Sequence, residues 1–589
     1  MRSHRFGILR RISKRIFLRF WRTRGLRFLT IFFALILVIF FWRWNDFFEQ
    51  HSKLVPRHGG TLTQYTTGKI ENLNPLSWEK SVLDRDIQGL IFSSIGRYNP
   101  HTGIVEPELG KWSTVDNQTF KVKIFPDARF SDGSRVTAQD VLFTYQEVLQ
   151  NPDFSNESLK KALEYIEISI DNQGHSITFV APERNTFFTT FFTIPILPAA
   201  YFEGSTVHDV VDPFFRFNRE PVGAGPFVVD KISPTTEFPT VIELIANPHY
   251  IRGEPYLESL IIKAYPIDTL SMPSNQIAFF SRLNFPQASG LEKTLFPTHQ
   301  KKIITIPRYA AAFFNLDRPV VERKYFRQAL HTATDKGEML ESEPGWRRLD
   351  SILSFSGIET QYQKKDFKKA RSFMHDAGLI YNRSQEIRTV GKNGDIVRIK
   401  IVTTDTPAIY SRMANKLAQT WQRELDIETD VIVVSPEEFP RILQTRDYDV
   451  LVFGQDISHA QNSLSVWHSS NTGKQNLSNL TNQKFDQLIE EIKFSGSLTD
   501  TFQISKTFDD LVPAILLGTP EYTFFVPRVL NGVTTPPKTP DDTGEQFNRI
   551  QRLSDIYFEV NKWYFYQKRV WDLIENKWLA YTKWRFGGQ

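Results

Sequence analysis

Residues Phe130–Val141, which read FSDGSRVTAQDV, predict a tight turn that leads directly into a helix. Asp132-Gly133 is a turn pair, because glycine tolerates positive φ and aspartate can hydrogen-bond its own backbone. Thr137 is a good N-cap residue, and Asp140 three positions later completes a capping box. An apolar stripe at helical spacing follows this cap. By spacing alone the segment is a junction between a loop and a helix. The fold to which it belongs has to be inferred from the rest of the sequence.

The length and composition of the chain indicate a multidomain globular protein. Its 589 residues are too many for one core, so two or more domains are expected. Cysteine is absent, which excludes disulfides, thiolate nucleophiles and cysteine-ligated metals. The absence of cysteine fits an extracytoplasmic bacterial protein as well as a cytosolic one, so it leaves the compartment open.

The formal net charge of +5 comes from the N-terminus alone. Residues 1–27 hold ten Arg and Lys residues and no acidic residue, and the rest of the chain has 61 basic against 66 acidic residues, a net charge of −5. The body of the chain therefore gives no support for nucleic-acid binding.

The apolar segment Phe28–Trp42 predicts an uncleaved transmembrane signal-anchor over residues 28–44. Fifteen residues fall short of the roughly 20 that span a bilayer, but Arg27 and Arg43 can snorkel, and Trp42 and Trp44 suit an interfacial belt. The positive-inside bias then places the N-terminus in the cytoplasm and the body outside, in a single-pass protein of the cell membrane. A cleaved signal peptide is the alternative, although no small-x-small site follows the segment. A buried core helix is disfavoured by the ten flanking positive charges.

Hydrophobic patterning predicts a mixture of helices and strands in the first half of the body. Gly59–Thr63 is a short first strand, and Asp86–Ile95 is a buried helix. Gln118–Ile124 alternates apolar and polar residues, as a half-buried strand does, and His175–Val180 repeats this signal after a turn. This half therefore predicts a mixed α+β region.

The second half predicts alternating strands and helices. Lys364–Gly378 is a helix capped by Asp366, and a second helical stripe runs from Tyr410 to Leu425. Strands are expected at Val397–Val402, Val431–Val434 and Asp449–Phe453. Strand–helix–strand order of this kind implies right-handed crossovers and a largely parallel sheet.

The sequence contains almost none of the motifs that mark common enzyme active sites. The chain has no G-x-S-x-G elbow, no H-E-x-x-H pair and no G-x-x-x-x-G-K-[ST] loop, and its twelve histidines lack metal-ligand spacing. Carboxylate pairs such as Asp84/Asp86 and Glu437/Glu438 are most simply solvated faces. We therefore expect neither an enzyme nor a bound cofactor or metal, with a secreted hydrolase as the remaining catalytic alternative.

Several short motifs follow one another along the chain in a recognisable order. They are Gly59–Leu62 (GGTL), Leu73–Pro75 (LNP), Pro107–Trp112, Phe130–Val141, Pro221–Phe227 (PVGAGPF), Asn247–Tyr250, Arg327–Leu330 (RQAL), Lys368–Gly378, Tyr448–Val450 and Asp486–Ile489. Each is weak alone, but their shared order over about 500 residues resembles the extracellular solute-binding proteins of family 5, the peptide-binding subunits of ABC importers.

This resemblance implies an α/β fold with a mixed α+β subdomain, arranged as a two-lobed periplasmic-binding-protein-like clamp after one N-terminal transmembrane helix. The strands that connect the lobes are expected near Tyr309–Asn315 and Leu530–Val533. The expected parts are a basic cytoplasmic arm (1–27), the signal-anchor (28–44), a stalk (45–58), lobe 1 (59–310, with an inserted subdomain at about 96–205), lobe 2 (311–528), a return to lobe 1 (529–565) and a C-terminal tail (566–589).

The resemblance also implies that the protein captures peptides in the crevice between its lobes and delivers them to an ABC transporter permease. The expected partners are a peptide, the permease and, through the N-terminal helix, the lipid bilayer; the protein is expected to be a monomer. Two alternatives keep the clamp: an oligosaccharide or metal chelate as the ligand, or a surface-anchored scaffold that is not coupled to transport.

Nine residues are candidates for ligand contact by alignment with the family. They are Trp78 and Glu79 in a loop of lobe 1, Phe453, Gly454, Gln455, Asp456, Ile457 and Ser458 on the crevice-lining strand of lobe 2, and Trp467 as an aromatic wall. Peptide-binding relatives often carry a G-W-x-x-D sequence on this strand, whose aspartate holds the ammonium group of the peptide. Here Ser458 stands at that position and Asp456 lies two residues earlier. Either Asp456 takes this role, or a free N-terminus is not the recognised feature.

Overall fold

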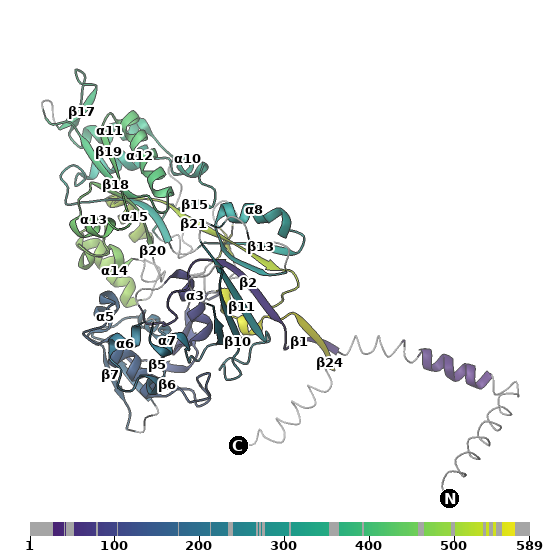
Figure 1. Ribbon diagram of the computed structural model, residues 1–589. Helices are drawn as coiled ribbons and strands as arrows, with labels where there is room; N and C mark the ends of the chain where they lie inside the picture. Colours follow the sequence, from purple (N-terminus) through teal and green to yellow (C-terminus); the bar gives the residue numbers. More distant parts are fainter. Residues whose placement is uncertain are drawn as a thin grey trace, which may run out of the picture. The chain divides into compact units, whose positions relative to one another are not determined.

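The computed structural model describes most of the chain. The described residues are 28–39, 42, 52–77, 81–102, 104–172, 174, 176–212, 214–233, 239–266, 269, 272–273, 277–305, 308–352, 364–390, 394–456, 464–495, 501–533, 538–540, 546–548 and 556–571. Residues 59–563 form one compact unit, and residues 1–58 with 564–589 form another. The larger unit contains the expected α/β body (Figure 1).

A mixed sheet runs through the larger unit. Its strand order is β19-β18-β20-β14-β21-β12-β2-β11-β10-β9, and β13 and β15 also pair with β21. The strands are β19 (Glu428–Val434), β18 (Arg398–Thr404), β20 (Val450–Asp456), β14 (Arg308–Phe314), β21 (Ala514–Pro527), β12 (Phe279–Leu283), β2 (Thr61–Thr67), β11 (Ser259–Tyr265), β10 (Thr240–Ala246), β9 (Phe227–Ile232), β13 (His299–Thr305) and β15 (Trp346–Arg348).

The long strand β21 connects the two expected lobes. Its first part pairs with β14, from Ala514 to Gly518, and its last part pairs with β12 and β13. The chain thus returns from lobe 2 to lobe 1 along a single 14-residue strand. The expected connection near Tyr309–Asn315 is present as β14, but the expected return near Leu530–Val533 is wrong. The return strand lies earlier, because the apolar run of β21 is buried along almost its whole length.

Lobe 2 has the predicted strand–helix order. Strand β18 is parallel to both β19 and β20, as expected, whereas β14 is antiparallel to β20. Helix α11 (Phe367–Asp376) is capped by Asp366, whose side chain accepts a hydrogen bond from the Lys369 N–H. Helix α12 (Ile409–Leu425) packs its predicted stripe into a core that contains the fully buried Trp421.

The predicted turn and helix start in lobe 1 are confirmed. Gly133 has φ +88°, and helix α4 (Ala138–Leu142) begins with a complete capping box between Thr137 and Asp140. The helix continues as a π-helix, η1 (Phe143–Leu149). Beside it lies a four-stranded sheet of order β5-β6-β8-β7, with strands Gly110–Ser113, Thr119–Ile124, Ser176–Val180 and Glu167–Ile170. Helix α3 (Val82–Ile91) begins four residues before the predicted Asp86, because Ser81 and Asp84 form a second capping box.

The remaining elements include short α-helices and two-stranded sheets. The helices are α5 (Glu157–Leu163), α6 (Val207–Val211), α7 (Arg216–Arg219), α8 (Phe285–Leu295), α9 (Lys324–Ala333), α10 (Lys336–Glu341), α13 (Phe439–Thr445), α14 (Gln483–Ser495) and α15 (Thr501–Leu511). The strand pairs are β3 (Gly96–Asn99) with β4 (Ile104–Pro107), β16 (Leu379–Asn382) with β17 (Ile387–Val390), and β22 (Lys538–Pro540) with β23 (Gln546–Asn548).

The smaller unit holds both ends of the chain. Residues 28–39 are helical and their apolar side chains are exposed, while positions 40, 41, 43 and 44 of the expected anchor lie outside the described residues. None of the helices in the described part of the chain combines the length and apolar character needed to cross a bilayer. Within the expected stalk, β1 (Ser52–Arg57) pairs antiparallel with β24 (Tyr566–Trp571), which lies in the expected tail.

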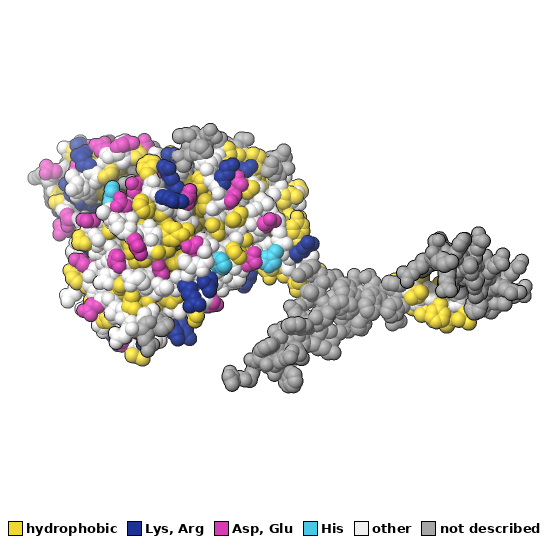
Figure 2. All heavy atoms as spheres, turned by 60° about the horizontal axis from the view of Figure 1, so that its bottom comes forward, with side chains coloured by type: hydrophobic (Ala, Val, Ile, Leu, Met, Phe, Trp, Pro, Cys, Tyr) yellow, Lys and Arg dark blue, Asp and Glu magenta, His cyan; other side chains and the backbone are white. Residues whose placement is uncertain are grey.

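Charges of both signs are mixed on the surface of the body. On the face that Figure 2 shows, Lys and Arg side chains alternate with Asp and Glu side chains, and the described residues there form no broad basic surface. This distribution agrees with the balanced charge of the sequence after residue 27.

Candidate functional site

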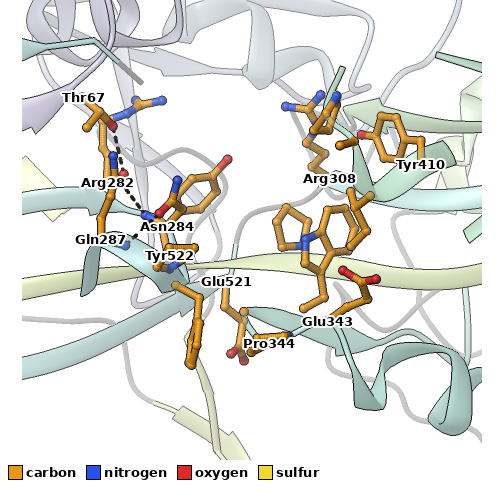
Figure 3. A pocket seen from close by; sticks show the side chains of 18 of the residues that line it. Thr67, Arg282, Asn284, Gln287, Arg308, Glu343, Pro344, Tyr410, Glu521 and Tyr522 are labelled. Atoms are coloured by element: carbon orange, nitrogen blue, oxygen red, sulfur yellow. Dashed lines mark hydrogen bonds between the residues drawn. The ribbon is translucent and has the colours of Figure 1, made fainter. Parts of the chain in front are cut away.

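A cavity of about 1080 Å³ lies between the two expected lobes. One wall comes from lobe 1, through the segment after β2, the start of α3 and the β12–α8 connection. The opposite wall comes from lobe 2, through the α10–β15 loop and the first turns of α12, and β21 crosses between the walls. Figure 3 shows Arg282, Asn284 and Gln287 on one side of the cavity and Arg308 beside Tyr410 on the other.

The wall from lobe 1 is fixed by a network of polar contacts around Arg282. This residue is nearly buried, has φ +59° and forms an ion pair with the buried Asp86. The Thr67 hydroxyl donates a hydrogen bond to the Arg282 carbonyl at 3.2 Å. Asn284 and Gln287 then cap α8 reciprocally, each side chain accepting from the other's N–H at 3.1 and 3.0 Å. These contacts hold the polar side chains of this wall to one another.

The wall from lobe 2 carries a strong ion pair and aromatic rings. Arg412 donates two hydrogen bonds to the buried carboxylate of Glu343, at 2.9 and 2.7 Å. This hydrogen bonding raises the pKa of Arg412 above its ordinary value. The Trp346 ring lies edge-on to Tyr410, with centroids 6.3 Å apart. The cavity thus combines apolar surface with cations whose charges are already partly neutralised.

Arg308 and Tyr410 form the polar part of this wall. The Nε of Arg308 lies 3.3 Å from Oδ1 of Asp456, and its side chain is 30% exposed. Burial opposes the charge on Arg308, but Tyr410 and Asp456 beside it raise its pKa above the ordinary value. Burial likewise raises the pKa of Tyr410, so its hydroxyl stays protonated and can donate.

The predicted contact residues on β20 lie directly behind this wall. Phe453 packs against Tyr410 and Phe439, with ring centroids 5.7 and 4.3 Å apart. Gly454 is buried against Tyr410. Neither residue is part of the cavity lining among the described residues. They support the cavity from behind, and whether they contact a ligand stays a prediction.

The next two residues of β20 are held by polar partners. Gln455 accepts a hydrogen bond from the Tyr309 hydroxyl at 2.7 Å and donates to the Gln475 carbonyl at 3.0 Å. Asp456 is half exposed and is paired with Arg308. The carboxylate that could replace the family's ammonium-binding aspartate is therefore not a lone charge.

The other predicted contacts divide into one buried residue and four that lie outside the described residues. Trp467 is 2% exposed and packs against Phe313 and Phe508, with centroids 5.7 and 4.9 Å apart, so its ring belongs to the core of lobe 2. The residues outside the described ranges are Trp78, Glu79, Ile457 and Ser458.

Sequence reasoning missed most of the cavity lining. Arg308 begins an apolar strand, and Tyr410 reads as part of a helical core stripe. The available signal for Tyr410 was its place in the first turn of a helix after a strand, because ligands of α/β proteins commonly bind at the carboxyl ends of strands. No comparable signal marked Glu343 or Arg282. Within the described residues, no group of three His, Asp or Glu side chains could hold a metal ion.

Comparison with known proteins agrees with the fold. Residues 103–476 match the model of the bacterial extracellular solute-binding proteins, family 5 Middle. The oligopeptide-binding protein AppA of Bacillus subtilis is 23% identical over 490 residues, covering 80% of this chain and 86% of AppA.

Two solved structures show the same fold. The structure of Bacillus subtilis AppA in complex with a nonapeptide has a TM-score of 0.64 at 20% identity and covers 87% of this chain and 99% of its own. NikZ from Campylobacter jejuni, in complex with Ni(L-His), has a TM-score of 0.64 at 21% identity and covers 86% and 99%. The family consists of substrate-binding proteins and not of enzymes. The chain therefore belongs to the family 5 extracellular solute-binding proteins of ABC importers.

Proposed function

We propose that this protein captures peptides in the cavity between its lobes and delivers them to the permease of an ABC importer. The observation that carries the proposal is the cavity of about 1080 Å³, whose lining joins segments of both lobes. A volume of this size is at the upper end of ordinary ligand pockets, which span roughly 300–1,000 Å³. It has room for several residues of an extended peptide.

The lining suits a ligand with an apolar body and charged ends. Apolar groups such as Leu83, Phe285 and Trp346 are interspersed with the ion pairs of Arg282, Glu343 and Arg308. Apolar surface accepts varied side chains with little selectivity, whereas charged groups orient the ligand.

A metal chelate is the second candidate ligand. It is supported by the likeness to NikZ, whose structure contains Ni(L-His). Such a ligand has its own carboxylate groups, so the protein would not need to supply metal ligands. The two candidates can be separated by identifying what the protein carries.

We also propose that the protein is anchored in the cell membrane by residues 28–44, with its body outside the cytoplasm. The support is the apolar sequence Phe28–Trp42, the exposed side chains of residues 28–39 and the basic arm before them. Membrane fractionation of cells that express the full chain tests this. Recovery in the membrane fraction after a high-salt wash is the expected result, and release by the wash would contradict it.

The ligand is best identified by native mass spectrometry of the full chain, purified in detergent. The expected result is a set of bound peptides, and recovery of a nickel chelate or a sugar instead would contradict the first proposal. Ala408→Trp fills the cavity from an exposed lining position and should abolish ligand recovery. Ala162→Trp makes the same substitution at an exposed position of α5 and should leave it unchanged.

A further inference from the structure

Among the described residues, three arginines line the cavity, and they differ in how well their charges are satisfied. Arg412 makes two short hydrogen bonds to the buried carboxylate of Glu343. Arg282 forms a close ion pair with the buried Asp86. Arg308 has a looser partner, because Asp456 is 51% exposed and the closest approach between the two charged groups, from Nε to Oδ1, is 3.3 Å. Of the three guanidinium groups, that of Arg308 has the most capacity left for a new anion.

The surroundings of Arg308 favour binding of a carboxylate. A guanidinium group presents several N–H donors in a planar fork that matches the two oxygens of a carboxylate. The Tyr410 hydroxyl lies beside it and remains protonated, so it can supply a further donor. The side chain of Arg308 is only 30% exposed, and partial burial of this kind strengthens such hydrogen bonds.

The glycine at residue 454 keeps Tyr410 in this place. A Cβ at Gly454 would lie 1.8 Å from the Tyr410 hydroxyl, so any other residue there would force the ring away. Gly454 begins the segment in which the sequence departs from the family's pattern. Its lack of a side chain makes room for the Tyr410 hydroxyl, a hydrogen-bond donor on the cavity side. This links Gly454 and Asp456 to ligand recognition without direct contact.

We propose that Arg308, assisted by Tyr410, is the specificity-determining residue that binds a carboxylate of the ligand. Because Asp456 is already paired with Arg308, the free acid end of the ligand is the recognised feature, and its free amino end is not. This inference rests on the proposed function, because it takes the carboxylate to be the C-terminus of a bound peptide. Asp456 keeps its contact with the Nε of Arg308, and the remaining N–H donors of the guanidinium group bind the ligand carboxylate.

The test is a competition between peptide pools on the full chain in detergent, read by native mass spectrometry. One pool of random pentapeptides has free carboxylates, a second has C-terminal amides and a third has acetylated N-termini. The protein should prefer the free acid over the amide by about tenfold or more, as for a charge-assisted hydrogen bond. It should bind the acetylated pool as well as the free one.

The variants assign the preference to Arg308. Arg308→Gln should bind the acid and amide pools equally, Arg308→Lys should keep part of the preference, and Tyr410→Phe should reduce it. Arg398→Gln is the matched control, because Arg398 is exposed, pairs with Glu428 and does not line the cavity. Thermal unfolding checks that each variant is folded. If Arg308→Gln does not fold, Arg308→Lys takes its place in the comparison of the acid and amide pools.

Two different failures can be told apart. Equal binding of acid and amide pools by the unaltered protein, or an unchanged preference in the Arg308 variants, would overturn the role of Arg308 and leave peptide binding intact. Absence of binding to all three pools would contradict the peptide function, and the carboxylate inference with it.

Discussion

The hydroxyl of Tyr410 occupies the space that a side chain at Gly454 would need, because a Cβ on residue 454 would lie 1.8 Å from that oxygen. Tyr410 is 1% exposed, so its ring has little freedom to move away. The two residues lie on different elements, β20 and α12. Their contact sets how far the Tyr410 hydroxyl, in the first turn of the helix, can reach into the cavity.

Gly454→Ala should therefore destabilise the protein and weaken ligand binding together. Overpacking of a buried site typically costs about 1–3 kcal/mol, and we expect a loss of this size in urea unfolding. Adding Tyr410→Phe to the Gly454→Ala variant should restore only part of the lost stability, since the ring carbon Cζ would still lie 2.6 Å from the new Cβ. If Gly454→Ala were as stable as the unaltered protein, the close packing of these two residues would be contradicted.

The capping box that opens the diagnostic segment gives a second prediction. The Asp140 carboxylate accepts hydrogen bonds from the Thr137 N–H at 2.8 Å and from the Ala199 N–H at 2.9 Å. Thr137→Ala should lower the free energy of unfolding by about 1 kcal/mol, and Thr137→Ser should leave it nearly unchanged. Asp140→Ala should cost more, because it leaves two N–H groups without an acceptor. Equal stability of Thr137→Ala and Thr137→Ser would contradict a role of the cap.

Local elements could be predicted from the sequence because their determinants are neighbours along the chain. Thr137 and Asp140 specify a helix start three residues apart, and Asp366 does the same for α11. The order of strands and helices in lobe 2 follows from apolar periodicity, which likewise needs only a short window.

The cavity could not be predicted in this way, because distant segments build it. Arg308 lies on β14 and Glu343 in the α10–β15 loop, and both line the cavity although they are far apart in the sequence. The same limit explains Trp467, which was expected at a crevice wall but packs on Phe313, 154 residues earlier in the sequence. The position of the return strand was also missed for this reason. Residues 514–527 form it, and not Leu530–Val533, because they pair with β14 at one end and with β12 at the other.

Two histidines predict that stability falls on mild acidification. His299 is 2% exposed, its Nε2 lies 2.8 Å from the Ala278 carbonyl, and burial lowers its pKa below 6.5. Burial also lowers the pKa of His331 to about 3. As the pH falls below 6.5 the unfolded chain binds protons that the folded chain does not, so stability is lost from there toward the folded pKa values.

Urea unfolding between pH 7.5 and pH 5 measures this effect. We expect the midpoint of the unaltered protein to decrease over this range, and the decrease to become smaller in His299→Gln and smaller still in His299→Gln/His331→Gln. Glutamine keeps a donor for the Ala278 carbonyl but does not titrate. A decrease of the same size in the double variant would show that other groups cause it.

A contact between the lobes gives the last prediction. Thr186 of lobe 1 donates two hydrogen bonds to the Lys493 carbonyl at the end of α14, from its N–H at 3.2 Å and its hydroxyl at 2.7 Å. Glu183 forms an ion pair with the Lys493 side chain, and Phe187 packs against the core of lobe 2. Opening of the clamp has to break these contacts, so they favour the arrangement in which the cavity is formed.

Removing the side-chain part of this contact should therefore favour separation of the lobes. Thr186→Val with Glu183→Gln loses one hydrogen bond of about 1 kcal/mol and an exposed ion pair worth less than that. We expect a larger radius of gyration without ligand in small-angle scattering, and ligand affinity about fivefold to tenfold weaker. Thr193→Val is the matched control, because the Thr193 hydroxyl bonds only to the Thr190 carbonyl of its own segment. An unchanged radius and affinity in the double variant would show that Thr186 and Glu183 do not hold the lobes together, since the loss would then have no effect on the clamp.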